Sequence, residues 1–191
     1  MNHLEPIAAR LPDLGLEGLL ISSESNEFYA VGFRGEGLVL VTARGSFYYT
    51  DSRYTEAAEE AVTGCAVTPL RQGETHLGLA AQQLHALGLT KLGFEEEYMS
   101  VSAYNLWTQV VKAEFVPASQ LLTDLRAVKD ADELAAMREA QRVTDEAFTE
   151  ILNYIKPGVT ESEIAARLTY IMASKGAERN SFDPIVACGP N

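Results

Sequence analysis

Residues 38–50 read Leu38-Val39-Leu40-Val41-Thr42-Ala43-Arg44-Gly45-Ser46-Phe47-Tyr48-Tyr49-Thr50, and this stretch decides the class of fold. Apolar and β-branched side chains fill the run that ends at Thr42, and aromatic side chains follow Ser46. Such side chains favour strands, and a connection this short that contains a glycine is typical of a hairpin. The sequence therefore predicts two adjacent antiparallel strands.

The flanking sequence alternates between helical and extended patterns. Helical spacing of apolar residues predicts helices within 4–11, 54–62 and 77–87, and a further helix opened by Ser100 as its N-cap. Short apolar runs predict strands at 19–21, 66–68, 92–94 and 115–116. We therefore expect an α/β domain, a mixed sheet with flanking helices, that ends near Leu125.

The residues after Leu125 show a different pattern, that of two consecutive amphipathic helices. Asp130 with Glu133, and Thr160 with Glu163, match the capping box that opens a helix. Each box precedes an apolar stripe, made of Leu134, Met137, Phe148, Ile151 and Ile155 in the first helix and of Ile164, Leu168, Ile171 and Met172 in the second. Pro157-Gly158 and Gly176 are expected to end these helices.

The last residues, 181–191, read Ser-Phe-Asp-Pro-Ile-Val-Ala-Cys-Gly-Pro-Asn. Phe182, Ile185 and Val186 predict the start of a strand in a second domain, whose sheet this sequence does not supply. The two preceding apolar helix faces are then left without cover. We therefore expect the isolated chain to self-associate.

Composition narrows the functions that are possible. The chain has 15 Lys and Arg against 27 Asp and Glu, a formal charge of −12, which repels nucleic acid and anionic membranes as partners. No apolar run reaches the ~20 residues of a membrane span, and the N-terminus lacks a signal-peptide pattern. Cys65 and Cys188 are expected to be buried thiols in a reducing compartment. A cytoplasmic protein is expected.

Residues able to carry chemistry are few. His3, His76 and His85 lack the spacing of a metal site, so each is interpreted as a satisfied histidine on a helix or at the surface. The run Glu95–Glu97 is interpreted as a solvated acidic rim. Ser22, Ser23 and Ser46 have no evident base, so nucleophilic catalysis is unsupported. No catalytic residue and no metal ligand is predicted.

Two neighbouring segments stand out, Asn26–Gly35 and Thr50–Tyr54. An Asp-Ser pair that caps a helix, and an Arg that reaches a neighbouring carboxylate, would give them a structural role. This structural interpretation is favoured over direct catalysis.

Together with Leu125–Glu133, Ile155–Glu161 and Phe182–Asn191, these segments resemble the Xaa-Pro peptidases, the family of prolidase, aminopeptidase P and creatinase. The resemblance implies a creatinase/prolidase-type N-terminal domain at 1–125. It also implies, at 126–191, a linker and the truncated start of a pita-bread metallopeptidase domain, namely its first two helices and a strand start.

The resemblance further implies a homodimeric hydrolase that cleaves the bond before proline in di- or oligopeptides. Proline has no N–H to be gripped, and in this family two divalent metals (Mn, Co or Zn) activate the attacking water. The family's ligands, two Asp, one His and two Glu, fall after Asn191, so none is carried over here. Phe182 and Ile185 are the candidates for a substrate wall, with core packing as the alternative for both. Cys188 stands where the family more often has Ser.

Three interpretations remain open. The favoured one is a fragment of a metal-dependent Xaa-Pro peptidase, inactive alone. The second is a metal-free relative, either a creatine amidinohydrolase or a peptide-binding module. The third is a short interaction protein.

Overall fold

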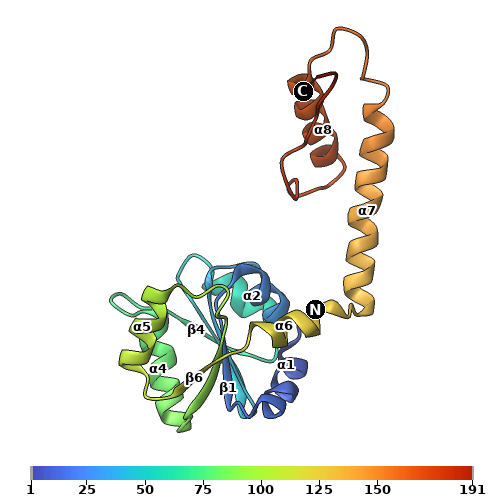
Figure 1. Ribbon diagram of the computed structural model, residues 1–191. Helices are drawn as coiled ribbons and strands as arrows, with labels where there is room; N and C mark the ends of the chain where they lie inside the picture. Colours follow the sequence, from blue (N-terminus) through green and yellow to red (C-terminus); the bar gives the residue numbers. More distant parts are fainter. Residues whose placement is uncertain (1, 191) are drawn as a thin grey trace. The chain divides into compact units, whose positions relative to one another are not determined.

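The computed structural model describes residues 2–190 and divides the chain into two compact units, Met1–Val128 and Lys129–Asn191 (Figure 1). The first unit is a mixed α/β domain. The second consists of two helices and an irregular segment. Among residues 2–190 no helix combines the length and the apolar character that a membrane crossing requires.

A six-stranded sheet forms the centre of the first unit, in the order β4-β3-β2-β1-β5-β6. β2 runs antiparallel to both of its neighbours, and the other pairs are parallel. The carboxyl ends of every strand except β2 therefore lie at one edge of the sheet. The strands are β1 (Gly18–Ile21), β2 (Gly37–Thr42), β3 (Gly45–Thr50), β4 (Ala66–Pro69), β5 (Lys91–Phe94) and β6 (Glu114–Pro117).

The predicted hairpin is confirmed. β2 pairs with β3 in a register that sets Leu40 opposite Phe47, and Gly45 has a φ of 137°, which a residue with a side chain rarely adopts. Because side chains alternate between the two faces of a strand, Val39 and Val41 enter one apolar cluster while Leu38 and Leu40 enter another.

Helices cover both faces of this sheet (Figure 1). One cluster joins strand side chains to α1, α2, α3 and α6, and the other joins them to α4 and α5. The helices of this unit are α1 (Leu4–Arg10), the 3₁₀ turn η1 (Leu11–Leu14), α2 (Glu24–Val31), α3 (Thr55–Ala61), α4 (His76–Leu87), α5 (Val101–Val110) and α6 (Ser119–Ala127).

Sequence patterns did not indicate α2 or α6. The buried face of α2 contains the carboxyl group of Glu27 beside Ala30 and Val31, so its apolar period is broken by a charged residue type. α6 begins after Ala118, which offers no side-chain cap, although Leu121, Leu122 and Leu125 of this helix pack into the core. Both helices are short, and tertiary packing rather than periodicity determines them.

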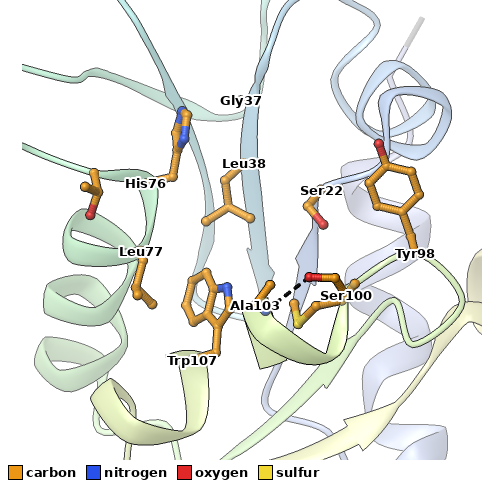
Figure 2. Close-up of a pocket in the computed structure, with 11 residues that line it drawn as sticks. Ser22, Gly37, Leu38, His76, Leu77, Tyr98, Ser100, Ala103 and Trp107 are labelled. Carbon is orange, nitrogen blue, oxygen red and sulfur yellow. Dashed lines mark hydrogen bonds between the residues drawn. The ribbon is translucent and has the colours of Figure 1, made fainter. Parts of the chain in front are cut away.

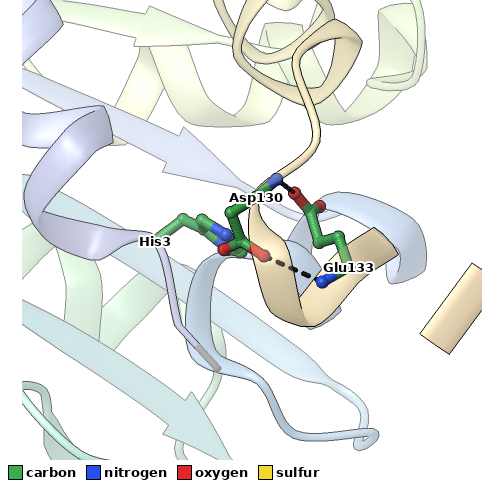
Figure 3. Close-up of side chains that lie close together, drawn as sticks. All are labelled: His3, Asp130 and Glu133. Atoms are coloured by element: carbon green, nitrogen blue, oxygen red, sulfur yellow. Dashed lines mark hydrogen bonds between the residues drawn. The ribbon is translucent and has the colours of Figure 1, made fainter. Parts of the chain in front are cut away.

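In the second unit both predicted capping boxes are confirmed, at the starts of α7 (Ala131–Ile151) and α8 (Glu161–Ser174). Figure 3 shows the first box, in which the Glu133 amide donates to Asp130 Oδ1 over 2.8 Å and the Asp130 amide donates to Glu133 Oε2 over 2.9 Å. Gly158 and Gly176 both have positive φ after their helices. α7 ends at Ile151, however, before the predicted Ile155.

The apolar contact between the two helices is made by Ala147 and Ile151 of α7 and by the predicted stripe of α8. Val143 of α7 is buried as well. Of the predicted stripe on α7, Ile151 packs against α8, whereas Leu134, Met137, Phe148 and Ile155 are exposed, as expected of an apolar face left without cover. Positions 143, 147 and 151 recur every fourth residue, and the small side chain of Ala147 leaves room for the buried Ile171.

The predicted strand start at 182–187 does not form, because within residues 2–190 no strand lies beside it to supply hydrogen bonds. Core packing of Phe182 and Ile185 is likewise absent, since these side chains are 72% and 87% exposed.

Cys188 is exposed rather than buried, whereas Cys65 is partly buried and burial raises the pKa of its thiol to about 12. Asn191 lies outside the described residues.

Candidate functional site

Polar side chains of the first unit gather at the carboxyl edge of its sheet, in the loops that follow β1, β3, β5 and β6. In open α/β sheets ligands bind in crevices at this edge. The residues concerned include Ser22 after β1, Asp51 after β3, Glu95 after β5 and Ser119 after β6. We therefore take this edge as the candidate functional site.

Glu95 ties β5 to the start of α2. Its carboxylate is almost fully buried and accepts four hydrogen bonds, from the amides of Ser22 and Ser23, the Ser23 hydroxyl and the Asn26 amide group, over 2.5–2.9 Å. Arg126 of α6 donates to Asn26 Oδ1 over 2.8 Å and orients it. A helix start at a strand end is where an α/β fold can bind an external anion, and here the protein's own carboxylate occupies that place.

Glu96 makes a similar connection to the start of α6. Its Oε2 accepts hydrogen bonds from the amides of Ala118 and Ser119 and from the Ser119 hydroxyl over 2.8–2.9 Å. Desolvation raises the pKa of Glu96, but the bonds from Ser119 and the neighbouring amides outweigh it, and the net pKa is lowered. The interpretation of Glu95–Glu97 as a solvated rim is therefore wrong for Glu95, which is buried. Glu96 and Glu97 are exposed, although Glu96 also accepts hydrogen bonds at the start of α6.

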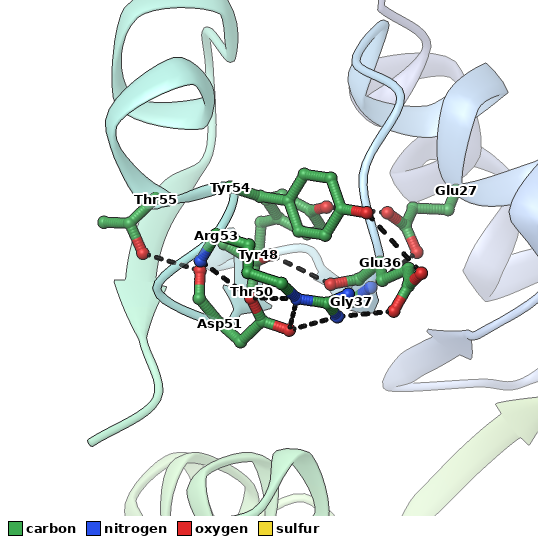
Figure 4. A network of polar contacts seen from close by, with 9 residues as sticks. All are labelled: Glu27, Glu36, Gly37, Tyr48, Thr50, Asp51, Arg53, Tyr54 and Thr55. Atoms are coloured by element: carbon green, nitrogen blue, oxygen red, sulfur yellow. Dashed lines mark hydrogen bonds and ion pairs between the residues drawn. The ribbon is translucent and has the colours of Figure 1, made fainter. Parts of the chain in front are cut away.

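A second buried carboxyl group, that of Glu27, lies beneath the loop between α2 and β2. Tyr48 donates its hydroxyl proton to Glu27 Oε1 over 2.6 Å, and the Gly37 amide donates to Oε2 over 3.1 Å (Figure 4). Burial raises the pKa of Glu27 to about 7. A Cβ at Gly37 would lie 2.5 Å from the Tyr48 ring, so this close packing requires glycine.

Arg53 reaches a neighbouring carboxylate, as predicted for the segment Thr50–Tyr54. The predicted Asp-Ser cap does not form, because the N-cap of α3 is Tyr54 and no side chain caps this helix. The Arg53 guanidinium group contacts Asp51 Oδ2 and Glu36 Oε2, each over 2.6 Å (Figure 4). The hydrogen bonds from Arg53 lower the pKa of Asp51. The network connects the loop before β2 to the loop after β3.

A pocket of about 550 Å³ opens beside these networks, between the starts of α4 and α5 (Figure 2). His76 and Leu77 line it from α4, and Ala103 and Trp107 from α5. His76 Nε2 is buried and has no hydrogen-bond partner within residues 2–190, and burial, partly opposed by the charge of Asp51, lowers the pKa of the ring.

The three histidines thus differ in environment. His3 Nδ1 lies 2.8 Å from the Tyr29 carbonyl oxygen, and His85 is exposed, as expected of satisfied histidines. The same expectation is wrong for His76, whose position in the first turn of a helix gave no sign of the pocket. Phe182 and Ile185 belong to the second unit and are not part of this edge.

The edge as a whole is suited to binding rather than to proton transfer, because Glu95 and Glu96 are engaged with backbone amides and Asp51 is engaged with Arg53. Architecturally, the chain is an α/β domain with a six-stranded mixed sheet, followed by a helical pair.

Residues 4–128 match the family model of the Creatinase/Prolidase N-terminal domain, and residues 135–191 match that of Metallopeptidase family M24. The chain belongs to the creatinase/prolidase family. The uncharacterized peptidase YqhT of Bacillus subtilis is 35% identical over 97% of this chain and 53% of its own length. The chain spans about half the length of the curated relatives it matches.

Two solved structures show the same architecture. An Xaa-Pro dipeptidase from Bacillus anthracis superposes with a TM-score of 0.88 at 32% identity, over 94% of this chain and 50% of that chain. An aminopeptidase P from Streptococcus thermophilus superposes with a TM-score of 0.60 at 25% identity, over 65% of this chain and 95% of that chain.

Proposed function

We propose that this chain is the N-terminal part of a metal-dependent Xaa-Pro peptidase and has no peptidase activity by itself. The observation that carries the proposal is the order of the two family matches, an N-terminal domain at 4–128 followed by the beginning of a metallopeptidase domain at 135–191. The Xaa-Pro dipeptidase from Bacillus anthracis superposes on 94% of this chain, which supports the same specificity.

Two divalent cations, Mn, Co or Zn, would supply an activated water and polarise the scissile carbonyl group when bound. The described residues do not form such a site within either unit. All three histidines precede residue 129. In the second unit Asp130, Glu133 and Glu163 cap helices, and Arg142 pairs with carboxylates of α7. These side chains of the second unit therefore have structural roles.

For the substrate wall we propose Phe182 and Ile185. Both apolar side chains are exposed in an irregular segment that neither helix of the second unit covers. An apolar wall would suit the proline ring, which offers no N–H for recognition. Burial against a substrate or against further protein would remove the cost of this exposure.

The proposal is tested by assaying hydrolysis of Ala-Pro with added Mn²⁺, Co²⁺ or Zn²⁺. We expect no turnover above a chelator-treated control for the 191-residue chain, and metal-dependent turnover for the complete product of the reading frame that contains it. In that product Phe182→Ala should raise KM, while Tyr170→Ala, which removes another exposed aromatic side chain of this unit, should not. Turnover by the 191-residue chain, or a complete product that is inactive with every metal, would contradict the proposal.

A further inference from the structure

Two carboxyl groups are buried among the described residues, and they differ in the number of hydrogen-bond donors around them. Glu95 is 2% exposed and accepts four hydrogen bonds. Glu27 is 3% exposed, and within the described part of the chain it accepts only two, from the Tyr48 hydroxyl over 2.6 Å and from the Gly37 amide over 3.1 Å. An ionised carboxylate offers about four acceptor sites, so ionised Glu27 would keep some of them unsatisfied and away from water.

The charges around Glu27 also disfavour its ionised form. Burial is the main cause of its raised pKa, and the charges of Glu24 on its own helix and of Glu36 before β2 add to it. Tyr48 is the titratable group that faces Glu27 from β3, and β2 has no charged side chain. Within residues 2–190 the basic side chains of neighbouring segments have other partners, namely Arg34 with the ring of Phe28, Arg53 with Glu36 and Asp51, Arg126 with Asn26, and His3 with Tyr29.

Residues 34–36, which precede β2, close over the pair formed by Glu27 and Tyr48. The backbone at Gly35 packs on Tyr48 so closely that a Cβ there would lie 2.6 Å from the hydroxyl oxygen. The segment joins β2 at Gly37, whose amide donates to Glu27 (Figure 4). Glu27 therefore holds the point at which the segment enters the sheet.

Two further contacts hold this segment. Thr50 donates its hydroxyl proton to the Glu36 carbonyl oxygen over 2.9 Å, and Arg53 pairs with the Glu36 carboxylate over 2.6 Å. The side chains of this ion pair are 60% and 65% exposed, and exposed ion pairs contribute little to stability. Phe33, just before the segment, packs against the core. Release from Tyr48 therefore need not extend beyond residues 34–36.

We propose that residues 34–36 form a pH-sensitive flap at the carboxyl edge of the sheet, closed while Glu27 is protonated and released when Glu27 ionises. A neutral carboxyl group can accept from Gly37 and share its proton with Tyr48, so the closed flap leaves it satisfied. An ionised carboxylate is stabilised by water, which reaches it when the flap moves away from Tyr48. Because Gly37 also lines the pocket between α4 and α5, release alters one wall of that pocket (Figure 2). The flap acts independently of any peptidase activity.

The direction of the pH effect is set by the two arrangements of Glu27. Burial raises the pKa of the closed group to about 7, whereas a hydrated carboxyl group titrates near pH 4.5. Below about pH 4.5 both arrangements keep the proton and the closed flap has its full stability. Between these values only the released form loses the proton, so release increases as the pH rises. From pH 5 to pH 8 the equilibrium constant for release should rise about fiftyfold.

The test measures solvent exchange of the Gly37 amide by proton–nitrogen NMR on the full chain from pH 5 to pH 8. Each rate is divided by the rate in an unstructured peptide at the same pH, and we expect this protection to fall by about fiftyfold. The amide of Leu40, a fully buried residue of the same strand, reports global unfolding. Because local release exposes little surface, low concentrations of urea should speed exchange at Leu40 and leave it unchanged at Gly37.

Three variants assign the effect to Glu27. Glu27→Gln is neutral at every pH, so the protection of Gly37 should change by less than about twofold over the same range. Tyr48→Phe removes a donor that favours the ionised form, so the fall in protection should steepen, and this variant keeps the test valid if Glu27→Gln does not fold. Glu56→Gln, at an exposed position of α3, is the matched control and should behave as the parent chain does.

Three results would overturn the inference: protection of Gly37 that does not change with pH, the same pH dependence in Glu27→Gln as in the parent chain, or equal opening constants and equal urea dependence at Gly37 and Leu40. The last result would mean that Glu27 acts only on global unfolding and that no flap is released.

Discussion

Glu27 is a carboxyl group that the fold keeps away from water. Its side chain is 3% exposed, and burial is the main cause that raises its pKa to about 7. The hydrogen bonds from Tyr48 and Gly37 lower this pKa by less than burial raises it, and the charges of Glu24 and Glu36 raise it further. At neutral pH the group is therefore partly protonated.

The raised pKa predicts that Glu27 destabilises the fold as the pH rises. Between about pH 4.5 and pH 7 the folded carboxyl group retains a proton that the unfolded chain releases, so the free energy of unfolding falls across this window. Above it the accumulated cost is on the order of 3 kcal/mol. Glu27→Gln stays neutral, can accept from Gly37 and can donate to the Tyr48 oxygen. We expect the variant to gain stability relative to the parent chain from pH 5 to pH 8.

Urea unfolding at a series of pH values measures this difference. Glu56→Gln, which makes the same change at an exposed position of α3, should show no such trend. A Glu27→Gln difference that stays constant with pH would show that the carboxyl group titrates normally.

At the scale of elements, one carboxylate holds the start of α2 in place. Isolated helices as short as α2 are marginal in water, so this helix depends on tertiary contacts. Glu95 provides several of them by accepting from the amides of Ser22 and Ser23 and from the Asn26 side chain. The strand β5 thereby fixes where α2 begins.

Glu95→Ala should consequently lower the free energy of unfolding by about 3 kcal/mol or more, because buried amides lose their acceptor. Hydrogen exchange should rise first at the amides of Ser22, Ser23 and Asn26. Glu97→Ala removes an exposed carboxylate from the same run and should change the stability by less than about 0.5 kcal/mol. Equal effects of the two substitutions would restore the interpretation of the run as a solvated rim.

At the scale of the whole molecule, the two units differ in how completely they bury apolar side chains. The first unit has apolar clusters on both faces of its sheet. In the second, Leu134, Met137, Phe148, Leu152 and Ile155 are exposed. Each such side chain is worth about 1.5–3 kcal/mol when buried, which favours association of the chain.

We therefore predict that the 191-residue chain self-associates with increasing concentration, whereas residues 1–128 form a monodisperse domain. The cut belongs after Val128 rather than at Leu125, because Arg126 at the end of α6 donates to Asn26. Light scattering coupled to size-exclusion chromatography distinguishes the two chains. A full chain that stays monomeric, and that is as stable to heat as residues 1–128, would contradict the prediction.

Local patterns in the sequence were sufficient for much of this architecture. The hairpin at 37–50, the capping boxes at Asp130 and Thr160, and the cap at Ser100 are all determined by residues close in sequence. These features depend on glycine geometry, on side-chain capping and on the alternation of strand side chains. Each acts over only a few residues, so the amino-acid sequence is enough to predict it.

Only the tertiary structure decided the roles of Glu27, Glu95 and His76. The hydrogen-bond partners of Glu95 lie more than 60 residues away in the sequence. One side of the pocket beside His76 is formed by α5, which is also distant in the sequence. A charged or polar residue is either solvated or buried and hydrogen-bonded, and the amides and apolar side chains around it decide which. That environment is created when β1, β5 and the helices pack together, and no local pattern contains it.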